Sequence, residues 1–275
     1  MERYTYRPLR FYITVFAVTW FFWLLAILCN ESSMLFLLMF FGMVTPAIVA
    51  VITVFASKNK ALKQDFKRKI VGFYRIKPRY IILAVGLFAI VVVASIGTSI
   101  LFGGSVNQFS FTEDFSFSIG GTSALLTILL ASSIEELGWR GYGEDAVGAY
   151  HNWFNESIIF GVIWACWHIP LFWVPGTYQY DLKEMGIIYV INFLLSVIPL
   201  DFLQTWVYVK NNRSMLATII FHIFINIMQE KINMTPGTKC IETIFVVIAA
   251  IVIVLTNKEM FFETKHVGNL LEEHY

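Results

Sequence analysis

Long stretches of the chain are almost entirely hydrophobic. Because a bilayer core about 30 Å thick takes roughly 20 helical residues to cross, each stretch of that length is a candidate membrane span. The stretches lie near residues 11–29, 34–56, 80–103, 119–139, 156–174, 185–209, 214–230 and 240–256, the seventh being short and interrupted by polar residues. The pattern predicts an all-α, polytopic membrane protein with about eight transmembrane helices.

Basic residues gather at every second connection between these stretches. Three arginines precede the first stretch, nine Lys and Arg residues lie within residues 57–79, and two follow the sixth stretch. The connections between them hold few basic residues, and residues 104–118 hold none. Because short cytoplasmic loops of membrane proteins are enriched in Lys and Arg, both termini are predicted to be cytoplasmic. We expect the basic 57–79 loop to bind anionic lipid headgroups.

Composition agrees with a chain solvated mainly by lipid. Hydrophobic residues make up 57% of the 275 residues and charged residues 14%, and the mean hydropathy is +0.68. A net charge of +1 gives no general basic face for nucleic acid. We found no internal repeat and no linker, and the first stretch has no cleavage site after it, so residues 1–275 are predicted to form one membrane domain with that stretch retained. A bacterial plasma membrane is the expected location.

The fourth stretch carries three ionisable residues, Glu135, Glu136 and Arg140. A charge at the centre of a span costs roughly 2.5 to 3.5 kcal/mol, so such residues are candidates for function. Glu136 and Arg140 are four residues apart and share a helix face, which predicts an ion pair with a structural role. Glu135 is turned by about 100° from Glu136 and is expected to point toward a different neighbour.

Two of the five histidines, His168 and His222, lie inside predicted spans. Counting about 1.5 Å per residue from the span ends places both histidines and Glu135 in the cytoplasmic half of the bilayer. Asn226 follows His222 by one helical turn and shares its face, and Trp164 precedes His168 in the same way. The sequence therefore predicts that Glu, His and Asn side chains meet at one depth.

These residue types allow two routes to amide hydrolysis. In the first, Glu135 is the general base for a water held by His168, and His222 and Asn226 stabilise the oxyanion. In the second, Glu135, His168 and His222 bind a catalytic Zn²⁺ that keeps an open water position. We found no His-Glu-x-x-His helix, Gly-x-Ser-x-Gly elbow or nucleotide loop. Residue types alone do not separate the two routes.

Three short motifs on separate stretches resemble the pattern of the CPBP intramembrane protease family, which includes the type II CAAX prenyl endopeptidases. The motifs are Glu135-Glu136-x-x-x-Arg140, Trp164-x-x-x-His168 and His222-x-x-x-Asn226. They lie within about residues 119–230, spans four to seven, which are the expected catalytic core. The second motif usually begins with Phe, and Trp at position 164 keeps an aromatic side chain there. Phe160, one turn earlier, is a second aromatic candidate for that place.

The resemblance implies an eight-helix fold with a cavity open to the cytoplasmic side and to lipid. The substrate would be a membrane-tethered peptide, lipid-modified or not, that is cut near its C-terminal end. The resemblance makes Glu135 the catalytic base, His168 its partner on the water, and His222 and Asn226 the oxyanion donors. Glu136, Arg140 and Trp164 would be structural. The family has been described as both metal-dependent and glutamate-type, and we favour a site without a cofactor because an Asn amide is a poor zinc ligand but a good donor.

Two readings without peptidase activity remain. One is a non-catalytic bacteriocin-immunity or scaffold protein with the same fold. The other is a transporter in which the buried Glu and His residues relay protons. The sequence has no inverted repeat of the kind that many transporters show.

Overall fold

A computed structural model describes residues 4–29, 31–112, 124–263 and 266–268, and within those ranges every regular element is a helix. The long helices are α1 (Pro8–Ile27), α2 (Ser32–Ala56), α4 (Pro78–Leu101), α5 (Ala124–Gly138), α7 (Trp153–Trp167), α9 (Ile187–Lys210), α10 (Met215–Lys231) and α11 (Pro236–Thr256). Shorter helices are α3 (Lys60–Ile70), α6 (Glu144–Gly148), α8 (Tyr178–Met185) and α12 (Lys258–Phe262). The tight turns are η1 (Gly72–Arg75), η2 (Val106–Phe109), η3 (Trp139–Gly143) and η4 (Ile169–Trp173).

Each predicted span coincides with one long helix, which confirms the all-α membrane class. Six helical segments of the described chain are long and apolar enough to cross a membrane. They are Pro8–Ile27, Ser33–Ala56, Pro78–Leu101, Trp153–Trp173, Ile187–Lys210 and Pro236–Thr256. Helices α5 and α10 are shorter, with 15 and 17 residues, so the count of eight spans stays a prediction. Residues 119–123 of the predicted fourth span lie outside the described ranges.

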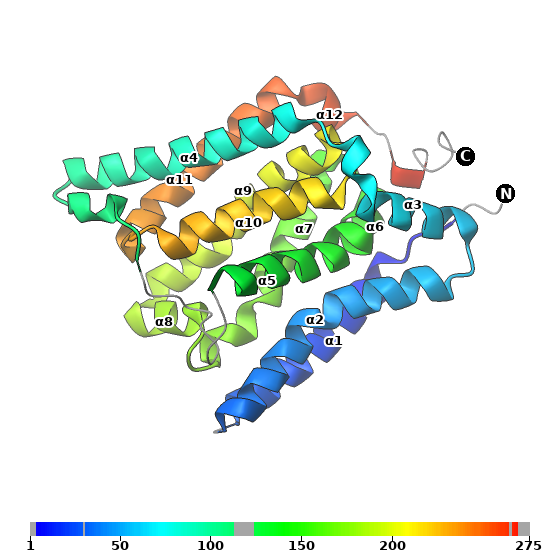
Figure 1. Cartoon of the computed structure of the whole chain (residues 1–275), viewed down its shortest axis with the longest axis horizontal. Helices are drawn as coiled ribbons and strands as arrows, with labels where there is room; N and C mark the ends of the chain where they lie inside the picture. Colours follow the sequence, from blue (N-terminus) through cyan, green and yellow to red (C-terminus); the bar gives the residue numbers. More distant parts are fainter. Residues whose placement is uncertain (1–3, 30, 113–123, 264–265, 269–275) are drawn as a thin grey trace.

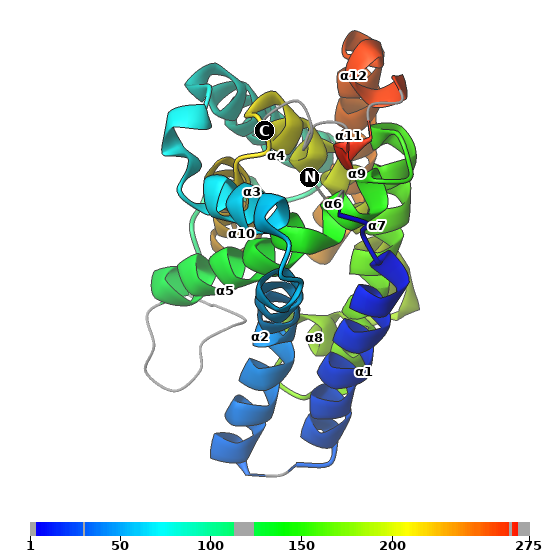
Figure 2. The same ribbon diagram turned by 90° about the vertical axis from the view of Figure 1, so that its right-hand side faces the viewer.

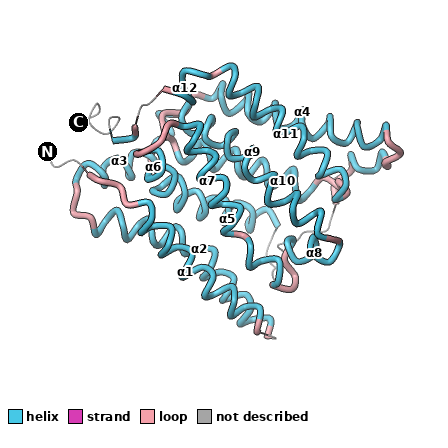
Figure 3. The backbone as a smooth tube through the Cα atoms, turned by 180° about the vertical axis from the view of Figure 1, so that it is seen from behind, coloured by secondary structure: helices cyan, strands magenta, loops and turns pink. Residues whose placement is uncertain are grey.

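The helices form a bundle with two distinct ends (Figure 1). One end carries both termini with α3, α6 and α12, and we call it the terminal end (Figure 2). The opposite end, which we call the far end, carries α8 and η2 (Figure 3). Helices α1 and α2 lie side by side at one edge of the bundle, α4 and α11 lie at another, and α5, α7 and α10 lie between them (Figure 1). The central helices are therefore those that carry the predicted motifs.

Helix α5 does not end where the sequence predicted. It runs into η3, a π-helical turn at Trp139–Gly143, and then into α6, and all residues of η3 and α6 are buried. Single π-helical turns are frequent at functional sites because they re-aim the side chains that follow. The helical run therefore extends toward the terminal end past the predicted limit of residue 139 and carries Arg140 and Glu144 into the interior.

Part of the basic 57–79 loop is folded onto the protein, which corrects the expectation that the loop only binds headgroups. Lys69 in α3 is 1% exposed. Its Nζ donates to the carbonyl oxygens of Arg140 and Gly141 at 2.9 and 2.7 Å and to Asp145 Oδ2 at 2.7 Å. The positive charge of Lys69 is thus used inside the protein, where a buried carboxylate requires a partner.

Gly138 allows α2 and α5 to approach closely, and we expect Gly138→Ala to destabilise the fold. A Cβ at this position would lie 2.6 Å from the carbonyl carbon of Pro46 and 2.8 Å from the backbone N of Ala47, and backbone atoms cannot move aside as a side chain does. Overpacking of this kind costs about 1–3 kcal/mol or more. Thermal unfolding in detergent should give a lower midpoint for Gly138→Ala.

The matched control is Gly97→Ala in α4, where an added Cβ meets nothing within 4 Å. Because Ala favours a helix over Gly, the midpoint of this control should stay the same or rise. Equal midpoints for the two variants would show that the approach of α2 to α5 tolerates a methyl group.

Candidate active site

The far half of the bundle encloses a cavity of about 350 Å³. Its walls are largely apolar and come from α1, α2, α5, α7, α8, α9, α10 and α11. Five of the predicted site residues line it: Glu135, Trp164, His168, His222 and Asn226. An apolar cavity with a few convergent polar groups is typical of a ligand or active site.

Glu135 and His168 are both oriented by Trp164. The indole Nε1 of Trp164 donates to Glu135 Oε2 at 3.3 Å. The backbone carbonyl of Trp164 lies 2.7 Å from Nδ1 of His168, the residue that caps the C-terminus of α7. Because a carbonyl oxygen only accepts, His168 Nδ1 carries the proton and Nε2 is left as an acceptor. His168 is therefore prepared to accept a hydrogen bond from a water molecule.

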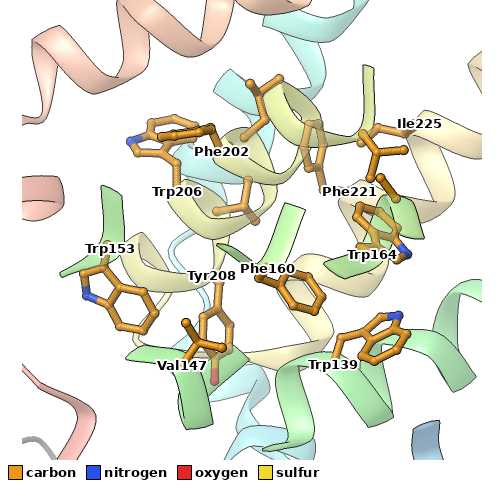
Figure 4. Close-up of a cluster of buried hydrophobic side chains, with 14 of the residues drawn as sticks. Trp139, Val147, Trp153, Phe160, Trp164, Phe202, Trp206, Tyr208, Phe221 and Ile225 are labelled. Carbon is orange, nitrogen blue, oxygen red and sulfur yellow. The ribbon is translucent and has the colours of Figure 1, made fainter. Parts of the chain in front are cut away.

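The aromatic part of the second motif packs as the sequence indicated. The rings of Phe160 and Trp164 are stacked with centroids 6.2 Å apart, and Trp139 meets the Phe160 ring edge-on at 5.6 Å. The Arg140 guanidinium lies 5.0 Å from the Phe160 ring centroid. Figure 4 shows Trp139, Phe160 and Trp164 in one buried cluster. Trp164 thus holds Glu135 and His168 from a rigid aromatic layer.

His222 is held from behind by Glu136. Its Nδ1 lies 2.9 Å from Glu136 Oε1, and Arg140 contacts the same carboxylate through NH1 at 3.3 Å and Nε at 3.3 Å. The predicted Glu136–Arg140 ion pair is therefore confirmed. The contact between Glu136 and His222 was not predicted, because α5 and α10 meet only in the folded structure. Glu136 fixes the ring so that Nε2 is free to face the cavity.

Asn226 has a partner that sequence reasoning missed. Its Nδ2 donates to Oγ of Ser132 at 3.0 Å, and Ser132 is completely buried. An Asn amide has two N–H donors, so one remains for a ligand. Ser132 precedes Glu135 by three residues and shares its face of α5, which was the only available signal for this contact.

Arg140 contacts more than its predicted partner. Besides Glu136 it pairs with Glu144 Oε2 at 2.5 Å and with Asp201 Oδ1 at 2.6 Å, and all four side chains are 0% exposed. Asp201 is an acid within the sixth hydrophobic stretch, so the sequence could have marked it as a candidate for a buried ion pair. Nothing in the sequence related it to Arg140. We call these four residues the Arg140 cluster.

A second buried cluster closes the terminal end. Arg213 pairs with Asp145 and, at 2.7 Å, with Asp65 Oδ2, and Lys69 completes it. Burial raises the pKa of the Asp145 carboxyl, but the charges of Arg213 and Lys69 outweigh this effect and hold that pKa below its usual range. Asp145 is therefore ionised at neutral pH. We call these four residues the Arg213 cluster.

The cavity lies on the far side of both clusters. Its lining comes from the C-terminal part of α1, the N-terminal parts of α2, α9 and α11, and α8. The side toward the termini is filled by the fully buried Arg140 cluster. Cytoplasmic termini and a cavity open to the cytoplasm both stay predictions.

The predicted zinc ligands Glu135, His168 and His222 line the same cavity. Among the residues that the structure describes, no group of three His, Cys, Asp or Glu side chains is placed to hold a metal ion. Glu135 accepts from an indole, while Nδ1 of His168 meets a carbonyl and Nδ1 of His222 meets a carboxylate. In zinc sites too, the imidazole nitrogen that does not bind the metal donates to a carbonyl or a carboxylate. These contacts leave Nε2 of both histidines available, so the zinc-dependent alternative stays a prediction.

A polytopic helical bundle with Glu, His and Asn side chains around an apolar cavity defines a membrane protein with a hydrolase-like site. A family model described as "Type II CAAX prenyl endopeptidase Rce1-like" matches residues 118–228. The chain is also 39% identical over 267 residues to the "CAAX prenyl protease 2" of Methanococcus maripaludis, covering 96% of this chain and 98% of that protein. The chain therefore belongs to the CAAX prenyl endopeptidase family of intramembrane proteases, which confirms the resemblance of the motifs.

Proposed function

We propose that this protein is an intramembrane endopeptidase that hydrolyses a membrane-tethered peptide by glutamate-activated water. The observation that carries the proposal is the convergence of Glu135, His168, His222 and Asn226 on one cavity. Family membership supports an endopeptidase, and the contacts of these four residues support the roles assigned to them.

In the first step, a water molecule lies between Glu135 and the free Nε2 of His168. Glu135 takes a proton from this water as the oxygen attacks the carbonyl carbon of the scissile amide. The carbonyl oxygen becomes an oxyanion, which accepts hydrogen bonds from Asn226 and from Nε2–H of His222. The contact of His222 Nδ1 with the Glu136 carboxylate holds the ring of this second donor in place.

In the second step, the tetrahedral intermediate collapses. The C–N bond breaks, and Glu135 gives its proton to the leaving nitrogen, which departs as an amine. The products are a carboxylic acid and an amine, one water has been consumed, and Glu135 returns to its ionised form. The new acid then passes its proton to the amine, which leaves a carboxylate and an ammonium group. Burial of the site excludes bulk water, so the fixed dipoles act at low dielectric and stabilise charge more strongly than in solution.

The walls of the cavity support a hydrophobic, lipid-attached substrate. Phe36, Phe40 and Met43 from α2 and Ile128 from α5 line the cavity on one side. The named relative is a CAAX prenyl protease, and a prenyl chain gains about 0.8 kcal/mol per CH₂ that is buried against such walls. We therefore propose a lipid-modified peptide, cut near its C-terminus, as the substrate class.

The test is cleavage of prenylated peptides by the purified protein in detergent. The reaction is run in H₂¹⁸O, and the products are analysed by mass spectrometry. We expect one ¹⁸O atom in the new carboxylate and an unchanged rate after treatment with a zinc chelator. A rate that falls with the chelator and returns with added Zn²⁺ would favour the metal-dependent alternative. Absence of cleavage of every peptide would favour the immunity or scaffold reading.

A further inference from the structure

A second polar group lies on the cavity wall at the far end, away from the predicted catalytic residues. It consists of Lys239 and Glu242 in the first turns of α11, Gln229 near the end of α10, and Tyr178 in α8, all of which line the cavity. Lys239 is the only Lys or Arg among the described residues that line it. The proposed mechanism uses none of these side chains.

The contacts of the Lys239 ammonium group are with neutral partners. Its Nζ donates to the backbone carbonyl of Gln229 at 2.9 Å and lies 4.5 Å from the centroid of the Tyr178 ring. The backbone carbonyl of Lys239 accepts from Asn192 Nδ2 at 3.4 Å, which ties this turn of α11 to α9. A carbonyl and a ring leave one of the three N–H donors of the ammonium group available.

The acid on the same face contacts Gln229 and also interacts with the charge of Lys239. Glu242 Oε1 accepts from Gln229 Nε2 at 2.7 Å, and Glu242 is 4% exposed. Gln229 thus contacts both ionisable groups, through its side chain to Glu242 and through its carbonyl to Lys239. This arrangement holds the ammonium group in place on the cavity wall, where a dielectric lower than that of water strengthens its attraction for an anion.

We propose that Lys239 binds the C-terminal carboxylate of the peptide substrate. The inference rests on the proposed function, because a peptide that occupies the cavity brings one anionic group that every linear peptide carries. A fixed cation on the cavity wall holds the end of the chain, as in other sites that capture a terminal carboxylate. The position of the cut is then measured from the end of the peptide, which makes Lys239 a specificity-determining residue.

The test compares two peptides of the same sequence, one with a free C-terminal acid and one with a C-terminal amide. Wild-type protein should show a KM at least about tenfold lower for the acid, the effect of a charge-assisted hydrogen bond. Lys239→Met should raise the KM of the acid to that of the amide, leave the amide unaffected, and change kcat little in both cases. Lys239→Arg should keep a preference for the acid, since it keeps the charge.

Lys183→Met is the matched control, because Lys183 lies on α8 at the same end and pairs with Glu184 at 3.0 Å on the surface. It should preserve the preference for the acid. Equal KM values for acid and amide with wild-type protein would overturn the inference even if no Lys239 variant folds. The inference would also be overturned if Lys239→Met slowed the cleavage of both peptides by the same factor, because Lys239 would then have a structural role. If wild-type protein cleaves neither peptide, the proposed function fails first.

Discussion

Replacing Glu135 by glutamine is expected to lower kcat by roughly 10²–10⁴-fold, the contribution of a positioned general base, while the protein stays folded. Glutamine has nearly the same shape, and its side-chain oxygen can still accept from Trp164 Nε1, which donates to Glu135 at 3.3 Å. An amide oxygen cannot take the proton of the attacking water. The loss should therefore appear in kcat, with a small change in KM.

The measurement is the initial rate of peptide cleavage by mass spectrometry, together with the thermal unfolding midpoint of each variant. Glu184→Gln, at a surface position where the side chain is 58% exposed, is the matched control and should keep the wild-type rate. A Glu135→Gln protein with wild-type turnover would remove Glu135 from the mechanism. Loss of folded protein would instead assign it a structural role.

Replacing Arg140 by alanine is expected to prevent the protein from reaching its folded state in good yield. The change leaves Glu136, Glu144 and Asp201 in a fully buried site without their guanidinium partner. Breaking one buried pair costs about 3–5 kcal/mol, a large part of a typical stability of about 5–15 kcal/mol. Size-exclusion chromatography in detergent and the thermal midpoint should both show the loss.

Arg79→Ala is the control for loss of one arginine, because Arg79 lies on the exposed surface beside the Tyr80 ring. It should behave like the wild type. Arg140→Lys keeps the charge but loses the planar guanidinium group that contacts three carboxylates. Its thermal unfolding midpoint should lie between those of the wild type and Arg140→Ala. Normal yield and normal activity for Arg140→Ala would contradict the structural role of this residue.

The helices were predictable because hydropathy is a local property. Every predicted span coincides with a long helix, and the i, i+4 spacing of Glu136 and Arg140 was enough to predict their ion pair. The bounds were less predictable, since the π-helical turn that extends α5 to α6 has no hydrophobic signature.

The partners across the bundle were not predictable from one sequence. Asp201 lies 61 positions from Arg140, and Arg213 lies 68 positions from Asp145. No spacing rule relates residues on different helices, so these contacts become visible only when the chain is folded. The same holds for His222, whose contact with Glu136 spans 86 positions.

Two sequence signals bear on the side of the membrane on which the cavity opens. The basic residues assign the terminal end to the cytoplasm, whereas the resemblance implied a cytoplasmic cavity. The fold places the cavity in the half that faces away from the terminal end. Sequence patterns describe each loop by itself, so the side of the membrane for the termini and for the cavity opening stays a prediction.

The Arg140 cluster and the Arg213 cluster also bear on how well the membrane holds back ions. A hydrolase within a bilayer must admit water, and a continuous file of water would let protons leak down the membrane potential, which is worth about 2.3 kcal/mol per charge per 100 mV. Arg140, Asp201 and Glu144 are completely buried beneath the cavity, and Asp145 is buried behind them. These packed side chains fill the interior next to the cavity, so water that serves the proposed hydrolysis would have no continuous file through this part of the protein.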